Sequence, residues 1–174
     1  MSCGLYESMK SMILNNCKIN IIAAIGLNNE LGYQNKLLWN IPSDLKRFKE
    51  LTMNSTIIMG RNTYNSIGKE LKGRSNFVVS SSELDVKYRF ETLIKAINSV
   101  KTDECFLIGG KMIYEEGLKY CDRVYLTQVL SKFDNCDVFF PTFNKDNFFI
   151  SKESIIFAEN NYKYKFIDYE IKKS

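Results

Sequence analysis

The pattern of apolar and polar positions predicts a chain that alternates short buried strands with amphipathic helices. The segment from Ile19 to Ile25 is β-branched and apolar on both faces, which is typical of a central strand in a covered sheet. Further strands are expected at 56–59, 76–80 and 104–108, and helices at 43–53, 62–67, 92–100 and 111–118. From residue 123 onward only strands are expected, at 123–129, 148–154 and 162–171. Repeated strand–helix units followed by strands predict an α/β fold with a mainly parallel central sheet, flanking helices and a C-terminal antiparallel strand section.

Two segments fall outside this pattern. Residues 1–17 carry no strong periodicity and are expected to form a loose N-terminal extension, with residues 18–174 forming a single domain. Residues 27–40 are expected to be a long loop between the first strand and the first helix. Loops of this length are more often lids or binding loops than idle connectors.

Composition narrows the possible class of protein. A chain of 174 residues with 45% hydrophobic and 25% charged residues fits one globular domain, which excludes disorder. No apolar run approaches the roughly 20 residues that span a bilayer. The net charge of +4 is spread along the chain without a basic block. We therefore expect no membrane or nucleic-acid partner, and take a monomer as the default.

Cysteine and histidine usage restricts the chemistry further. The five cysteines are odd in number and form no CxxC pair, so we expect reduced thiols in a cytoplasmic protein. The chain has no histidine, which removes the commonest metal ligand, the usual general base and every Ser-His or Cys-His arrangement. We expect no metal site. The chemistry must depend on carboxylates, an external cofactor, or both.

Two predicted strands run into glycine at the point where a helix begins. One reaches Gly60, with Arg61 and Thr63 behind it, and the other reaches Gly109 and Gly110. Such turns present free helix N–H groups to phosphate oxygens, although each turn alone is also explained by close packing. Parallel strands bring their carboxyl ends to the same edge of a sheet, so the pair favours one large phosphate-bearing ligand. Neither turn matches the GxGxxG fingerprint of an ordinary dinucleotide domain.

A carboxylate lies near the start of the helix expected at 43–53. At about 100° per residue, Phe48 and Leu51 share the helix face of Asp44. If that face is buried, loss of hydration raises the pKa of Asp44, which then suits both donating a proton and gripping a nitrogen-rich ring. A solvent-facing acid favoured by the helix macrodipole is an equal alternative. Together with the glycine turns, a sheltered acid suggests a redox enzyme that also moves a proton.

Between residues 19 and 171 the chain resembles dihydrofolate reductase. The resemblance is carried by six blocks in order, which are 21–24, 38–49, 58–68, Gly73-Arg74, 108–110 with Tyr114, and 125–127. Members of this family reduce 7,8-dihydrofolate to 5,6,7,8-tetrahydrofolate with NADPH, belong to one-carbon metabolism and are antifolate targets. Leu38, where the family usually has proline, and Lys111, where a small residue is common, depart from the pattern.

The resemblance implies roles for individual residues. Asp44 would bind the pterin and promote protonation of its N5, while NADPH delivers hydride to C6, and Trp39 and Thr127 would position Asp44 and a water. The substrate-binding residues would be Ile22, Leu45, Phe48, Ile67, Ile108 and Arg74, the last holding the glutamate α-carboxylate. The residues binding NADPH would be Ala24, Leu31, Gly32, Gly60, Arg61, Thr63, Ser81, Gly109, Gly110 and Tyr114. The loop at 27–38 matches the lid of the family, which excludes water from the nicotinamide.

Two alternatives remain at this point. A pyrimidine reductase of riboflavin synthesis would keep both glycine turns but would not need Trp39, Asp44 and Phe48 as a set. A non-catalytic nucleotide-binding or nucleic-acid-binding module would show a basic stripe and no acid on an apolar helix face. The sequence favours neither over a dihydrofolate reductase.

Overall fold

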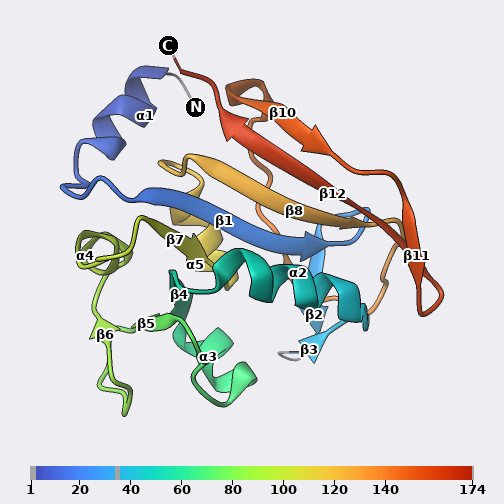
Figure 1. The fold of residues 1–174 in the computed structure, drawn as a ribbon, viewed down its shortest axis with the longest axis horizontal. Coiled ribbons are helices and arrows are strands. Elements are labelled where there is room, and N and C mark those ends of the chain that lie inside the picture. Colours follow the sequence, from blue (N-terminus) through green and yellow to red (C-terminus); the bar gives the residue numbers. More distant parts are fainter. Residues whose placement is uncertain (1–2, 34–35, 174) are drawn as a thin grey trace.

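In the computed structural model, residues 3–33 and 36–173 are described, and a central sheet runs through them (Figure 1). Its strands are β1 (Lys18–Ile25), β4 (Thr56–Gly60), β5 (Ser75–Val79), β6 (Arg89–Phe90), β7 (Glu104–Leu107), β8 (Arg123–Val129), β10 (Phe148–Glu153), β11 (Phe157–Glu159) and β12 (Tyr162–Ile171). Their order is β10-β12-β8-β1-β7-β4-β5-β6, and β11 also pairs with β12. The pairs from β8 to β6 are parallel, whereas β12 pairs antiparallel with β8, β10 and β11. The predicted α/β fold is confirmed.

Helices cover both faces of this sheet. They are α1 (Cys3–Lys10), α2 (Pro42–Thr52), α3 (Arg61–Ile67), α4 (Leu93–Asn98) and α5 (Lys111–Gly117), with a short 3-10 turn at Lys145–Asn147. Figure 1 shows α2 in front of the sheet and α5 behind it. Within the described ranges, none of these helices combines the length and the apolar character needed to cross a bilayer.

The two cores follow the alternation of side chains along the strands. In β1, Ile21 belongs to the core that includes Leu93 of α4 and Ile113 of α5. The next residue, Ile22, belongs to the core on the opposite face, against which Phe48 of α2 packs. Because successive strand residues point to opposite faces, a strand that is covered on both sides must be apolar throughout. This is why β1 reads as a continuous apolar run.

Residues 3–17 differ from the loose extension that the sequence predicted, while residues 1–2 lie outside the described part. Cys3–Lys10 form the helix α1, and Nζ of Lys10 lies 2.9 Å from both carboxylate oxygens of Asp122. Met9 and Ile13 pack against the larger core. The anchoring residue is over one hundred positions away in the sequence, so local periodicity could not reveal this contact.

The expected long loop at 27–40 also differs. It contains β2 (Glu30–Tyr33) and β3 (Lys36–Leu37), which pair with each other, and β2 pairs with β9 (Val138–Phe139) in a small separate sheet. The expected strands and helices elsewhere are present to within one or two residues at most ends, but β6 and β11 were also missed. Strands of two to four residues are too short to show alternation, and only their distant partners define them.

Candidate active site

The two glycine turns meet at one corner of the sheet. Parallel pairing of β4 with β7 places their ends together, and the N–H of Gly60 donates to the carbonyl oxygen of Gly109 over 2.8 Å. The hydroxyl oxygen of Thr63 lies 3.4 Å and 3.5 Å from where Cβ atoms would stand at Gly109 and Gly110. Gly109 has a φ of 126°, which a side chain would strain. The corner therefore combines a hydroxyl with backbone that a phosphate can approach closely.

The cation at this corner is Arg61, at the start of α3. Its side chain is exposed, and Nη1 donates to Oγ of Ser82 over 2.8 Å. The resemblance assigned Ser81 to the cofactor phosphates, and Ser81 is exposed next to this pair. Ser80 is buried, and its hydroxyl donates to the carbonyl oxygen of Ser82. Three consecutive serines gave no local signal for which hydroxyl meets the arginine, so Ser82 was missed.

Tyr114 of α5 connects this corner to the central strand. It is buried, and its hydroxyl oxygen lies 2.9 Å from the carbonyl oxygens of both Ile22 and Ile108. One phenolic proton can be donated to only one of them at a time. Burial raises the pKa of Tyr114 above its usual value, with a smaller contribution from the charge of Asp44. Tyr114 therefore stays protonated and ties β1 to the end of β7.

Asp44 lies in the first turn of α2, above the junction of β1 and β8. The hydroxyl of Thr127 donates to Oδ1 of Asp44 over 2.6 Å, and Thr127 pairs with Ala24 across the two strands. Burial raises the pKa of Asp44, while the Thr127 hydrogen bond and the charge of Arg47 oppose the rise. The helix begins at Pro42 without a side-chain cap. The Asp44 carboxyl group thus faces the sheet, and the residue is only partly exposed to water.

Apolar side chains from α2, α3 and the sheet pack together in one cluster. Ile22, Phe48, Ile67 and Ile108 belong to or pack against one cluster. Leu45 does not join them, because 54% of its surface is exposed. Four of the expected apolar residues are therefore brought into one cluster, and the fifth, Leu45, stays outside it on the surface.

Arg74 lies next to Phe48, a member of this group of apolar residues. Nη1 donates to the Thr52 hydroxyl over 3.2 Å, Nε donates to the carbonyl of Lys72, and the guanidinium carbon lies 6.0 Å from the Phe48 ring centre. Burial lowers the pKa of Arg74. A guanidinium has five N–H donors, so donors remain for an acidic group after these two contacts. The arrangement can bind a carboxylate beside an aromatic wall.

Trp39 and the β2 strand form the side of the site next to the small sheet. The Trp39 side chain is buried, and its ring centre lies 5.2 Å from that of Phe133. Leu31 packs against the larger core, and a Cβ on Gly32 would stand 2.9 Å from the carbonyl oxygen of Lys36. Only glycine fits there without shifting the β2–β3 pair. This requirement explains one of the glycines that the resemblance singled out.

Two charged residues that shape this region were missed from the sequence. Glu30 is only 1% exposed, and its carboxylate accepts hydrogen bonds from the backbone N–H groups of Asn28 and Phe133. It therefore ties the start of β2 to the 131–133 turn. Arg47 donates to Oδ1 of Asp168 over 2.9 Å. Helical spacing could have found Arg47, three residues after Asp44, whereas nothing local marks Glu30.

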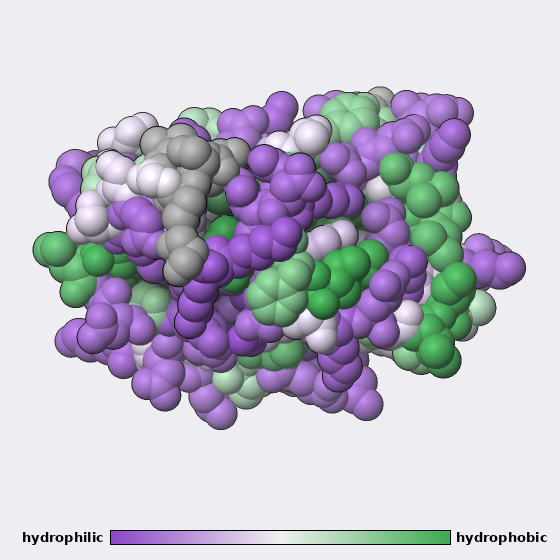
Figure 2. Space-filling view, turned by 90° about the horizontal axis from the view of Figure 1, so that it is seen from above, coloured by the Kyte–Doolittle hydropathy of each residue, from purple (hydrophilic) through white to green (hydrophobic). Residues whose placement is uncertain are grey.

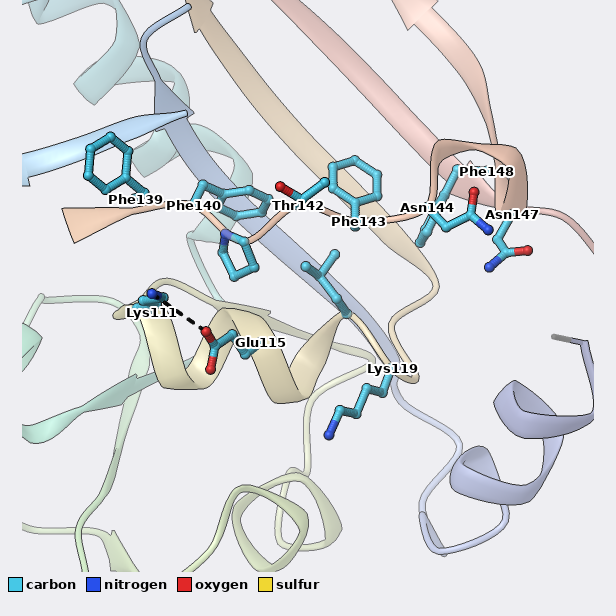
Figure 3. A pocket seen from close by; sticks show the side chains of 12 residues that line it. Lys111, Glu115, Lys119, Phe139, Phe140, Thr142, Phe143, Asn144, Asn147 and Phe148 are labelled. Carbon is cyan, nitrogen blue, oxygen red and sulfur yellow. Dashed lines mark ion pairs between the residues drawn. The ribbon is translucent and has the colours of Figure 1, made fainter. Parts of the chain in front are cut away.

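A separate hollow of about 680 Å³ lies beside α5 (Figure 3), and Asp44 is not among the residues that line it. Lys111, Glu115 and Lys119 border it on the helix side, and rings from the 139–148 segment border it on the other. Lys111 forms an ion pair with Glu115 at 3.8 Å. None of the residues predicted for the site lines this hollow.

Most of the chain is similar in sequence to known proteins. The sequence profile of the family described as dihydrofolate reductase matches residues 18–171. A dihydrofolate reductase of Bacillus subtilis is 36% identical over 163 residues, covering 90% of this chain and 96% of that protein. One of Haemophilus influenzae is 35% identical, covering 83% of this chain and 92% of that protein. One of Buchnera aphidicola is 44% identical over 64% of this chain and 71% of its own length.

Proposed function

Because the chain belongs to the dihydrofolate reductase family, we propose that it reduces 7,8-dihydrofolate to 5,6,7,8-tetrahydrofolate with NADPH. The observation that carries the proposal is the carboxyl group of Asp44, which is half-buried on the sheet side of α2 and hydrogen-bonded to Thr127. The chain has no histidine, so this acid supplies what an imidazole would supply elsewhere. The apolar cluster around Phe48 can pack against a flat ring such as the pterin.

The corner between β4 and β7 fits a dinucleotide phosphate. Gly60, Gly109 and Gly110 leave room for close approach, the Thr63 hydroxyl faces the same place, and Arg61 adds a fixed cation. We assign the phosphates to these groups, with Arg61 and Ser81 favouring NADPH over NADH. When bound, NADPH supplies the hydride. Ala24, Leu31, Gly32 and Tyr114 are assigned to its nicotinamide end.

Asp44 acts on the proton that accompanies this hydride. Its raised pKa leaves more of the carboxyl group protonated near neutral pH than an exposed aspartate would keep. Asp44 promotes protonation of N5 of the pterin, directly or through a water that Trp39 and Thr127 help to position. The dry, apolar surroundings strengthen its interaction with the pterin N–H groups. A proton then reaches N5 next to the carbon that receives the hydride.

The remaining contacts hold the substrate. Ile22, Phe48, Ile67 and Ile108 form the walls around the pterin and aminobenzoyl groups, with Leu45 closing the rim. Arg74 binds the glutamate α-carboxylate through the N–H groups that Thr52 and Lys72 leave free. The 27–38 segment, held at its base by Glu30, serves as the lid.

We also propose a cytoplasmic location, which the free thiols support. Cys17, Cys105, Cys121 and Cys136 are free cysteines, and the first three are buried. Disulfides are rare in reducing compartments, so these thiols support a cytoplasmic location.

The decisive experiment compares Asp44→Asn with the wild type. We expect the wild type to oxidise NADPH only when dihydrofolate is present. Asp44→Asn should lower kcat/KM by about 10²–10⁴-fold at neutral pH, because the proton donor is lost. The loss should shrink at low pH, where the substrate is already protonated. Stopped-flow absorbance of NADPH across a pH series measures both effects.

Two controls accompany this measurement. Asp103→Asn removes an exposed carboxylate just before β7 and should leave turnover unchanged. A pyrimidine substrate of riboflavin synthesis, offered with NADPH, tests the other reductase. Full activity of Asp44→Asn at neutral pH would remove the proton role, and turnover of the pyrimidine alone would replace the proposed substrate.

A further inference from the structure

A largely buried ion pair joins α2 to β12. Nη2 of Arg47 lies 2.9 Å from Oδ1 of Asp168, and the two side chains are 21% and 12% exposed. The ion pairs along the helix surfaces leave at least 50% of each side chain exposed, and the face of the molecule shown in Figure 2 is mainly hydrophilic. Withdrawing two charges from water is costly, so desolvation opposes the place that this pair takes.

The pair rests on a patch of four side chains beneath α2. Tyr125 pairs with Asp168, and Thr127 pairs with Phe166, across the antiparallel strands β8 and β12. Directly paired residues share a face of the sheet, as do residues two apart on one strand, so all four lie on one face. The guanidinium carbon of Arg47 lies 4.2 Å from the Phe166 ring centre and 5.7 Å from that of Tyr125. Three of the four side chains therefore hold Arg47.

The fourth member of the patch holds Asp44. The hydroxyl of Thr127 donates to Oδ1 of Asp44 over 2.6 Å. Asp44 and Arg47 are three residues apart in α2 and so are neighbours on the helix surface, while Thr127 and Asp168 are diagonal neighbours on the sheet. The two polar contacts therefore dock one turn of α2 in a single register. We infer that Arg47 is a positioning residue for Asp44, and that Asp168 holds the Arg47 cation in place close to the Asp44 carboxyl group.

The two charges of the pair act on Asp44 in opposite directions. Burial raises the pKa of Asp44, while the Thr127 hydrogen bond and the Arg47 cation oppose the rise. Asp168 carries the opposite charge and so partly cancels the field of that cation. Because the pair is shielded from water, solvent and salt screen it less than they screen a surface charge. Removing either partner should therefore leave the other to act on Asp44 without compensation.

The other titratable groups around Asp44 do not provide this balance. Tyr114 of α5 and Tyr164 of β12 lie close enough to feel its charge, and burial raises the pKa of each above its usual value, so both stay neutral while Asp44 titrates. Glu159 of β11 lies at the start of α2, where it accepts the N–H of Ser43 over 3.3 Å. β1 offers only apolar side chains at this end of the sheet. The ion pair can therefore be altered while these neighbours keep their charge.

The test measures the pKa of Asp44 directly, from the carbon-13 signal of its carboxyl carbon in the chain without substrate or cofactor. Asp44→Asn identifies the signal. Arg47→Met removes the cation and leaves the Asp168 carboxylate uncompensated, so the midpoint should move to higher pH. Asp168→Asn leaves the cation unopposed, so the midpoint should move to lower pH. The double variant, which lacks both charges, should titrate between the two single variants.

Two control variants separate charge from packing. Arg47→Lys keeps the positive charge and should titrate closer to the wild type than Arg47→Met does. Lys46→Met removes the same charge from the adjacent residue, whose side chain is 78% exposed, and should leave the midpoint unmoved. Circular dichroism checks that each variant is folded. If Arg47→Met does not fold, Asp168→Asn decides, and a midpoint that does not fall in this variant overturns the inference.

The same order of variants should appear in activity, and this second readout rests on the proposed function. The falling limb of kcat/KM against pH should move to higher pH in Arg47→Met and to lower pH in Asp168→Asn. Equal carboxyl midpoints, or shifts in the same direction in both single variants, would overturn the inference and leave the pair as a structural contact. Opposite shifts in the carboxyl signal of a chain that does not turn over dihydrofolate would support the inference and overturn the proposed reaction alone.

Discussion

At the scale of single residues, the contact between Thr127 and Asp44 does most to define the site. Thr127 is 4% exposed, so its hydroxyl finds its acceptor within the protein. The same bond moderates the effect of burial, because a donor to a carboxylate favours the ionised form. The balance between burial, Thr127 and Arg47 therefore sets how readily Asp44 holds a proton.

Replacing Thr127 tests this balance. Thr127→Val keeps the shape but removes the donor, so the pKa of Asp44 should rise further. Activity that needs the protonated acid falls as pH rises through this pKa, so the falling limb should move to higher pH. The plot of kcat/KM against pH measures the shift. Thr127→Ser, which keeps a hydroxyl, should preserve the wild-type limb, and an unmoved or lowered midpoint in Thr127→Val would contradict this account.

At the scale of elements, the packing of α5 on the sheet places the corner residue Tyr114. Gly117, in the last turn of α5, is buried so closely that a Cβ there would stand 2.4 Å from Cδ1 of Leu107 and 3.4 Å from Cδ1 of Ile21. Both side chains are fully buried. The helix approaches the sheet this closely only because the position has no side chain.

The same substitution in two helices separates packing from helix propensity. Gly117→Ala should lower the free energy of unfolding by about 1–3 kcal/mol, because the added methyl group overpacks the core. Gly4→Ala, in α1, meets no atom within 4 Å and should leave stability unchanged or slightly raised. Urea unfolding measures both. Equal stability of the two variants would show that α5 can move away from the sheet without cost.

At the scale of the whole molecule, α1 closes the end of the sheet opposite the glycine corner. Nζ of Lys10 reaches Asp122, whose Oδ2 also accepts the N–H of Ile19 at the start of β1, and the Tyr6 hydroxyl donates to the same carboxylate. Asp122 therefore joins the N-terminal helix to the first and the eighth strand. We retain residues 18–174 as the proposed domain, with α1 as an addition to it.

Removing residues 1–10 tests this addition. We expect unfolding to become easier by about 1–2 kcal/mol, which corresponds to a fall in Tm of about 2–8 °C, because Asp122 loses two partners. Activity at 25 °C should stay within about twofold of the wild type, since α1 lies at the other end of the strands. Scanning calorimetry and the NADPH assay measure the two effects. Lys10→Gln, which keeps α1, should show a smaller loss, and an unchanged Tm after deletion would contradict the role of the helix.

The structural predictions that were confirmed are those that depend only on residues close together in the sequence. β1 was found because a strand covered on both faces is apolar along its length, and the glycine corner was found because parallel strands end at one edge. The missed features depend on distant partners. β2 is defined by β9, and α1 by Asp122. Ser82 was missed because the two residues before it are also serines. Glu30 was missed because nothing in the nearby sequence indicates that it is buried.

The sequence by itself determined the class of fold, the order of its longer strands and helices and the family, because periodicity, turn glycines and ordered blocks are local properties. It also removed histidine chemistry and left Asp44 as the proposed acid. Only the tertiary structure decided that Asp44 is turned to the sheet, that Leu45 stays exposed and that Ser82 meets Arg61. The burial and the contacts of a side chain depend on which distant segments pack against it. Helical spacing predicts the face on which a side chain lies, but not which residues it meets there.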